Sequence, residues 1–221
     1  MINLLSLFSA FGLIIGNQQA LTIALPVPVK YEAKPLASHE MSLDQRYDVP
    51  SVNEVFKDNI LLNLAYLKNE PVNPRAVNWN QVEKPFSYQF SLQPGQTFAF
   101  HNDVKPNYTN VVKTTNAHFN WDEGFKSDGY LTGDGVCHLA SLIYWTAKDA
   151  GLAAEAPTNH DFMKINQIPK QHGVAIYDAP GQTDANSNQN LYVTNNTPKT
   201  VNFVFNYDGH NLTTRIDQVN S

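Results

Sequence analysis

The sequence has little cysteine and little positive charge. A single cysteine, Cys137, excludes a disulfide within the chain. The 15 Lys and Arg residues are outnumbered by 20 Asp and Glu, and the net charge is -5. Nucleic-acid binding requires a basic patch that neutralises phosphates, so we expect no nucleic-acid partner. The 7 histidines lack the i, i+4 and C-x-x-C spacings of zinc sites, so we expect neither a metal nor a cofactor.

Charged residues are also missing from the N-terminal stretch MINLLSLFSAFGLIIG, residues 1–16. This length is typical of the core of a signal peptide and is short for a transmembrane helix. We predict that residues 1–25 are a signal peptide, or a membrane anchor if they are not cleaved, and that the rest of the chain is extracytoplasmic. Residues 26–41 mix proline with charge and are predicted to be a linker. Residues 42–221 are predicted to form one domain.

Two helices and several strands are indicated within this domain. A capping box at Ser51 and Glu54, followed by apolar residues at helical spacing up to Leu67, predicts the first helix. The second is predicted to run from Asp134, as its cap, to Gly151. Alternating or short apolar runs predict strands at FSYQFSL (86–92), TFAFH (97–101), GVAIY (173–177), NLYVT (190–194), TVNFVFNY (200–207) and NLTTRI (211–216). We therefore predict an α+β fold, a strand-rich mixed domain with two main helices, one starting at the cysteine, and a C-terminal β-hairpin.

The position of Cys137 suggests a reactive thiol. It lies in the first turn of the second predicted helix, where unpaired backbone N–H groups and the helix dipole favour thiolate. Gly133 and Gly135 allow the preceding loop to bend sharply and to leave the sulfur accessible. The alternative is that Cys137 is a small buried residue, because free cysteine is among the most buried residue types.

A reactive thiol needs a base, and two histidines are candidates. His160 follows the second helix in a loop, and His172 opens the strand predicted at GVAIY, with Asp178 beyond it. The order Cys137, His172, Asp178 resembles that of transglutaminase-like cysteine proteins. His138 is adjacent to the cysteine on the helix, so it points about 100° away and is interpreted as a polar wall of the same site or a surface group.

Four acidic residues precede the second helix: Asp122, Glu123, Asp128 and Asp134. They lack the alternating spacing and the terminal glutamate of a calcium-binding loop. We interpret them as solvated loop groups and, for Asp134, as a helix cap.

The cysteine segment also indicates a family. GDGVCHLASLIYWTAKDAGL resembles the G-G-G-V-C-Q-x-x-S-x-x-x-x-x-A-x-x-A-G-L segment of VanW-like proteins. The stretches LQPGQTFAFHN, GVAIYDAPGQTDA and NLYVTNNT resemble further segments of the same family in the same order, and the resemblance spans residues 86–216. Two positions differ, since Asp134 replaces a glycine and His138 a glutamine. The histidine of the family pattern falls on His160, or on His172 if the alignment shifts.

The resemblance implies a role at the bacterial cell envelope. The family occurs in vancomycin and other glycopeptide-resistance gene clusters and alongside putative peptidoglycan-binding domains. Peptidoglycan or its peptide precursors are therefore the expected partners. The residues expected to bind them are those around the cysteine, namely Gly133, Asp134, Gly135, His138 and Ser141.

Two functions are compatible with these features. In the first, Cys137 attacks a carbonyl of a peptidoglycan peptide, His160 or His172 moves the proton, and the Gly133–Cys137 turn holds the oxyanion. This would give acyl transfer or amide hydrolysis. In the second, the protein is a non-catalytic binding or accessory module, with a groove formed by the glycine loop and four aromatic residues, Phe100, Tyr130, Tyr144 and Trp145.

Overall fold

A computed structural model describes residues 33–129 and 131–219. Its larger sheet is antiparallel and has the order β1 (Ala33–Ser42), β8 (Asn211–Val219), β7 (Val201–Tyr207), β2 (Phe86–Leu92). Alternate side chains of β2 and β7 point to the same inner face. Phe90 and Phe203, which are opposite each other in the register, stack there with ring centroids 4.9 Å apart.

The smaller sheet has the order β4 (Val111–Lys113), β3 (Thr97–Ala99), β6 (Tyr192–Thr194), β5 (Ala153–Glu155). Only the β3–β4 pair is parallel. The three residues of β3 are all buried, as are Tyr192 and Val193 of β6. This sheet is therefore part of the hydrophobic core.

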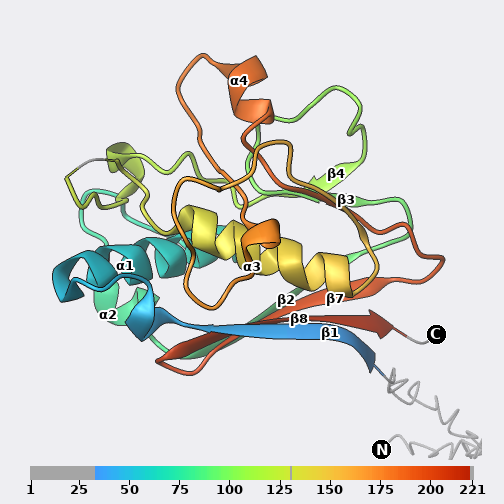
Figure 1. Ribbon diagram of the computed structural model, residues 1–221, viewed down its shortest axis with the longest axis horizontal. Helices are drawn as coiled ribbons and strands as arrows, with labels where there is room; N and C mark the ends of the chain where they lie inside the picture. The colour runs from blue at the N-terminus through green and yellow to red at the C-terminus, as the bar shows by residue number, and fades with distance from the viewer. Residues whose placement is uncertain (1–32, 130, 220–221) are drawn as a thin grey trace, which may run out of the picture. The chain divides into compact units, whose positions relative to one another are not determined.

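Two long helices, α1 (Pro50–Leu67) and α3 (Val136–Asp149), cover the inner face of the larger sheet. In Figure 1, β3, β4 and α4 (Thr183–Ser187) lie on the other side of α3 from that sheet. Because α3 contacts α1, β1, β5 and β8, it is the central element of the core. The short elements are α2 (Trp79–Val82) and the 3₁₀ turns η1 (Leu43–Gln45), η2 (Trp121–Glu123) and η3 (Lys170–His172).

The predicted fold class is confirmed, including the two main helices and the β7–β8 hairpin. The helix starts differ from those predicted. Helix α1 begins at Pro50, whose fixed φ suits the first helical position, and its N-cap Val49 makes no side-chain cap bond. Helix α3 is preceded by Gly135 in a left-handed conformation, again with no side-chain cap bond. The caps predicted at Ser51 and Asp134 are therefore wrong.

Two segments differ from their predicted structure. The predicted linker is wrong for residues 33–41, because they belong to β1, which pairs with β8 from Ala33↔Val219 to Ser42↔Asn211. The strand predicted at GVAIY is also wrong, since only Val174 forms an isolated bridge. The signal peptide or anchor predicted at residues 1–25, residues 26–32 and Tyr130 lie outside the described residues. Within the described ranges, no helix is both long enough and apolar enough to cross a membrane.

Candidate functional site

A cavity of about 510 Å³ opens beside the N-terminal turn of α3, and we call it the Cys137 cavity. It falls within the size range of small-molecule sites. Four segments of the chain and two single residues line it. They are residues 118–120, residues 128 and 131–138, residues 160 and 162–163, residues 176–178, and the single residues Tyr47 and Phe56. Of the site residues expected from the sequence, it brings together Gly133, Asp134, Gly135, Cys137, His138 and His160.

Two glycines fix the loop that leads into α3. Gly133 has φ 85° and Gly135 has φ 99°, conformations that residues with a side chain rarely adopt. A Cβ at Gly133 would lie 2.9 Å from the Cβ of Phe119, and one at Gly135 would lie 2.6 Å from the carbonyl oxygen of Phe56. Both positions therefore require glycine to let the loop pack against α1 and against the cavity wall at Phe119.

Cys137 is a half-buried residue, and its sulfur is hydrogen-bonded to the opposite wall. It accepts a hydrogen bond from the Ile176 N–H at 3.4 Å and donates one to the Ile176 carbonyl at 3.6 Å. Burial raises the pKa of the Cys137 thiol to about 11; the Ile176 N–H opposes this change and the Asp134 carboxylate adds to it. This direction is opposite to the lowered pKa that the helix start suggested, because desolvation outweighs the helix terminus.

His138 and His160 form the part of the wall next to Cys137, with ring centroids 6.3 Å apart. Burial, the charge of Arg46 and the neighbouring His160 hold the pKa of His138 well below its usual value. Burial also lowers the pKa of His160, whose Nδ1 donates a hydrogen bond to the Met163 carbonyl at 3.1 Å. Both rings are therefore neutral at pH 7. Within the described part of the chain, neither is hydrogen-bonded to the Cys137 sulfur.

His172 lies far from Cys137, at the other end of α3. Its ring stacks on Trp145 and meets the edge of Tyr144, each with centroids 5.9 Å apart. Trp145 is eight residues beyond Cys137, which corresponds to about 12 Å along a helix axis. His172 is not among the described residues that line the cavity. It also ends the η3 turn, whereas the sequence suggested that it opens a strand.

Ser141 and three residues of the predicted aromatic groove, Phe100, Tyr144 and Trp145, are not among the described residues that line the cavity. Ser141 is fully buried; its hydroxyl donates to the Cys137 carbonyl at 2.7 Å and accepts from the Val174 N–H at 2.9 Å. Phe100 is fully buried, and Trp145 stacks on His39 at 3.5 Å. Ser141 therefore attaches Val174, two residues before the lining residue Ile176, to α3.

His118, which the sequence did not single out from the other histidines in this half of the chain, also lines the cavity. Its Nδ1 lies 2.7 Å from Glu123 Oε1, and its backbone N–H donates to Glu123 Oε2 at 2.6 Å. The hydrogen bond to Glu123 is the main reason why the pKa of His118 is raised. The two residues are five apart, with His118 in a loop and Glu123 at the end of η2, and this spacing follows no helix or strand period. The signals in the sequence were the concentration of histidines in this half of the chain and the acidic pair at 122–123, which the sequence analysis interprets as solvated.

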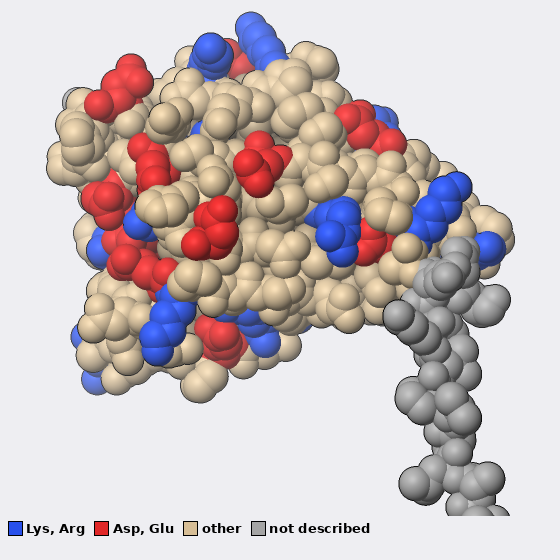
Figure 2. Space-filling view, turned by 90° about the horizontal axis from the view of Figure 1, so that it is seen from below, with Lys and Arg blue, Asp and Glu red and all other residues tan. Residues whose placement is uncertain are grey.

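Three carboxylates, those of Asp128, Asp134 and Asp178, line the cavity, and no Lys or Arg among the described residues does. Burial raises the pKa of Asp134 to about 6, although its carboxylate accepts a hydrogen bond from the Asp128 N–H at 3.1 Å. Burial raises the pKa of Asp178 as well. On the face drawn in Figure 2, by contrast, acidic and basic side chains are interspersed.

The mouth of the cavity is apolar. Leu131, Phe162, Met163 and Tyr177 are between 46% and 71% exposed, and all four line the cavity. Exposed large apolar side chains that gather in one place usually mark a binding surface.

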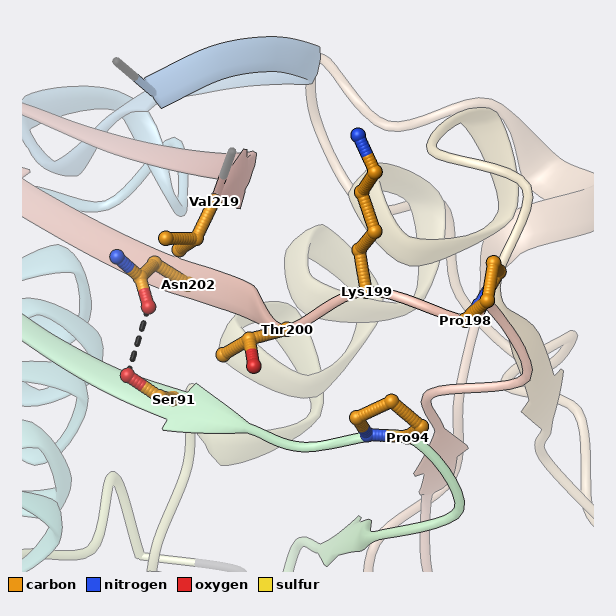
Figure 3. Close-up of a pocket in the computed structure, with 7 residues that line it drawn as sticks. All are labelled: Ser91, Pro94, Pro198, Lys199, Thr200, Asn202 and Val219. Carbon is orange, nitrogen blue, oxygen red and sulfur yellow. Dashed lines mark hydrogen bonds between the residues drawn. The ribbon is translucent and has the colours of Figure 1, made fainter. Parts of the chain in front are cut away.

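A second hollow, of about 460 Å³, lies where β2 and β8 end and β7 begins. Ser91 and Asn202 face each other across β2 and β7 in Figure 3, and the Ser91 hydroxyl donates to Asn202 Oδ1 at 2.6 Å. Two prolines, Thr200, Val219 and Lys199 complete its lining. Because it contains no histidine, cysteine or carboxylate among the described residues, the Cys137 cavity is the stronger candidate site.

Metal binding has no support in the geometry. In residues 33–129 and 131–219, no three or more His, Cys, Asp or Glu side chains are arranged to hold a metal ion.

The fold and the site together define an α+β protein with a polar, apolar-rimmed cavity at the start of its central helix. A family model described as VanW like protein matches residues 78–217, which is more than half of the chain. The chain therefore belongs to the VanW-like family. No curated protein and no solved structure matches it.

Proposed function

We propose that this chain is an extracytoplasmic module that acts at the bacterial cell wall and binds peptidoglycan or its peptide precursors in the Cys137 cavity, without covalent chemistry. Membership of the VanW-like family is consistent with a cell-wall-associated protein. Export or membrane anchoring through residues 1–25 stays a prediction from the sequence.

The observation that carries the proposal is the combination of an apolar mouth with a polar interior. Four exposed apolar side chains surround carboxylates and neutral imidazoles, and the thiol between them is hydrogen-bonded to backbone. At pH 7 a thiol with a pKa of about 11 is ionised in about one molecule in 10⁴. Such a thiol is a poor nucleophile but is compatible with a binding wall.

Binding can be tested by calorimetric titration of the protein with soluble peptidoglycan fragments. We expect Phe162→Ala, at the mouth, to weaken binding by about tenfold, since it removes a large apolar contact. Val112→Ala is the control, because Val112 is 46% exposed but lies on β4, away from the cavity. Equal affinities of the two variants, or no binding by the wild type, would contradict the proposal.

Cysteine-dependent acyl transfer or amide hydrolysis is the second candidate. It is favoured by one observation, that Cys137, His160 and the His118 ring oriented by Glu123 line the same cavity. In this reaction the sulfur would bond to the carbonyl carbon, the thiol proton would pass to an imidazole and then to the leaving amine, and water or an acceptor amine would cleave the thioester. Loss of fragment turnover in Cys137→Ser, with wild-type binding retained, would establish this function in place of the first.

A further inference from the structure

The Cys137 cavity has a charge imbalance that a ligand can correct. Asp134 and Asp178 are acidic lining residues, and His138 and His160, whose pKa values are lowered, carry no compensating charge. His118 is already paired with Glu123. In the described part of the chain no Lys or Arg lines the cavity, so its interior favours positive charge.

Two polar groups of the wall lack protein partners. His138 is only 3% exposed, lines the cavity, and has no hydrogen-bond partner for Nδ1 among the described residues. Asp178 Oδ1 accepts a hydrogen bond from the Asn186 side-chain amide at 3.0 Å, but its buried Oδ2 has no partner there. Unsatisfied buried polar groups are rare and costly, so hydrogen bonds from a ligand or from water are expected at this wall.

The apolar mouth determines what kind of cation fits. A ligand that reaches the carboxylates passes Leu131, Phe162 and Met163, which favour contact with an alkyl chain. A bare metal ion would gain nothing from these contacts, and no suitable ligand cluster exists within residues 33–129 and 131–219. An anionic membrane surface is disfavoured because the carboxylates would be repelled by it.

We propose that the Cys137 cavity binds a primary ammonium group at the end of an alkyl stem, as in a lysine-type residue of a peptide. The ammonium lies between Asp134 and Asp178, and its stem lies against the apolar mouth. The inference rests on the proposed peptide-binding function and specifies which group of the peptide is recognised.

The test compares two synthetic peptidoglycan stem peptides by calorimetry, both acetylated at the N-terminus and both containing one lysine. In one peptide the lysine Nε is free, and in the other it is acetylated, which removes its charge. We expect acetylation to weaken binding at least about tenfold, and added salt to weaken binding of the free-amine peptide only. Because this comparison uses the wild-type protein, it does not depend on the folding of a variant.

A charge variant tests the same contact from the protein side. Asp178→Asn keeps an oxygen that can accept the Asn186 hydrogen bond but removes the charge, and we expect it to weaken binding of the free-amine peptide by about tenfold. Asp184→Asn removes an equal charge from an exposed position of α4 outside the cavity, and its affinity should stay within about twofold of wild type.

The outcomes separate the two proposals. Equal binding of the acetylated and free-amine peptides would overturn ammonium recognition and leave peptide binding standing. Absence of binding by both peptides would overturn both proposals. Preference for the free amine together with loss of affinity in Asp178→Asn supports both.

Discussion

The reactivity of the sole thiol distinguishes a binding wall from a nucleophile. A thiol with a pKa of about 11 has about one hundredfold less thiolate at pH 7 than one with the ordinary value of 9.0. Since iodoacetamide reacts with thiolate, we expect alkylation of Cys137 in the folded protein to be slower than that of the unfolded chain by about this factor. The cause is desolvation of the sulfur beside Ile176.

The assay follows carboxamidomethylation by mass spectrometry at a series of pH values from 6 to 10. The folded protein should show a rate that rises about tenfold per pH unit without a plateau. The same protein in guanidinium chloride should approach a plateau near its ordinary pKa, and Cys137→Ser should not react. A plateau below about pH 8.5 in the folded protein would refute the reasoning and favour the enzyme.

Three other measurements test the site. In denaturant titrations, Gly135→Ala should lower the free energy of unfolding by more than about 2 kcal/mol, because its Cβ would lie 2.6 Å from a backbone oxygen of α1. The control is Gly95→Ala, which has φ 77° but open space around it and should lower the free energy of unfolding by about 1 kcal/mol. The raised pKa of Asp134, about 6, stabilises the fold below the unfolded value of 3.8 and loses this effect as pH rises through 6. Relative to Asp134→Asn, wild-type stability should therefore fall by on the order of 1–2 kcal/mol between pH 4 and pH 7; an equal pH dependence would contradict this. Glu123→Gln should lower the pKa of His118 in an NMR titration of its ring protons, and an unchanged midpoint would show that the carboxylate is not the cause.

The longest strands that the sequence predicted correctly alternate between a buried and a more exposed side. In β2 the aromatic residues alternate with polar ones, and in β7 they alternate with Asn202, Val204 and Asn206, so the period of two was visible. The edge strand β1 was not visible, because it contains Pro35 beside a register irregularity and is largely polar. Proline and polar residues are tolerated at an edge, where one side of the strand has no partner.

Residues 173–177 were predicted to be a strand but do not form one. Their apolar run suggested a strand, but two of their backbone N–H groups bond to side chains of α3, that of Val174 to Ser141 and that of Ile176 to Cys137. No sequence rule describes pairing between an extended segment and a helix.

The sequence located only part of the candidate site, because the other part depends on contacts between segments that are distant in the chain. The glycine loop and Cys137 form one continuous motif, so sequence reasoning located them together. The contribution of His118 and the placement of His172 at the far end of α3 depend on tertiary packing. The electrostatic effect at the sulfur was also hidden, because the depth of burial decides its sign.

The segment 174–176, which leads into the cavity wall at Ile176, is attached to α3 through Ser141 and Cys137, which are one helical turn apart. The distance between α3 and this segment therefore depends on two small side chains as well as on the backbone bridge between Asn159 and Val174. A substitution at either position would move Ile176, and with it one side of the cavity, without changing the pairing of either sheet.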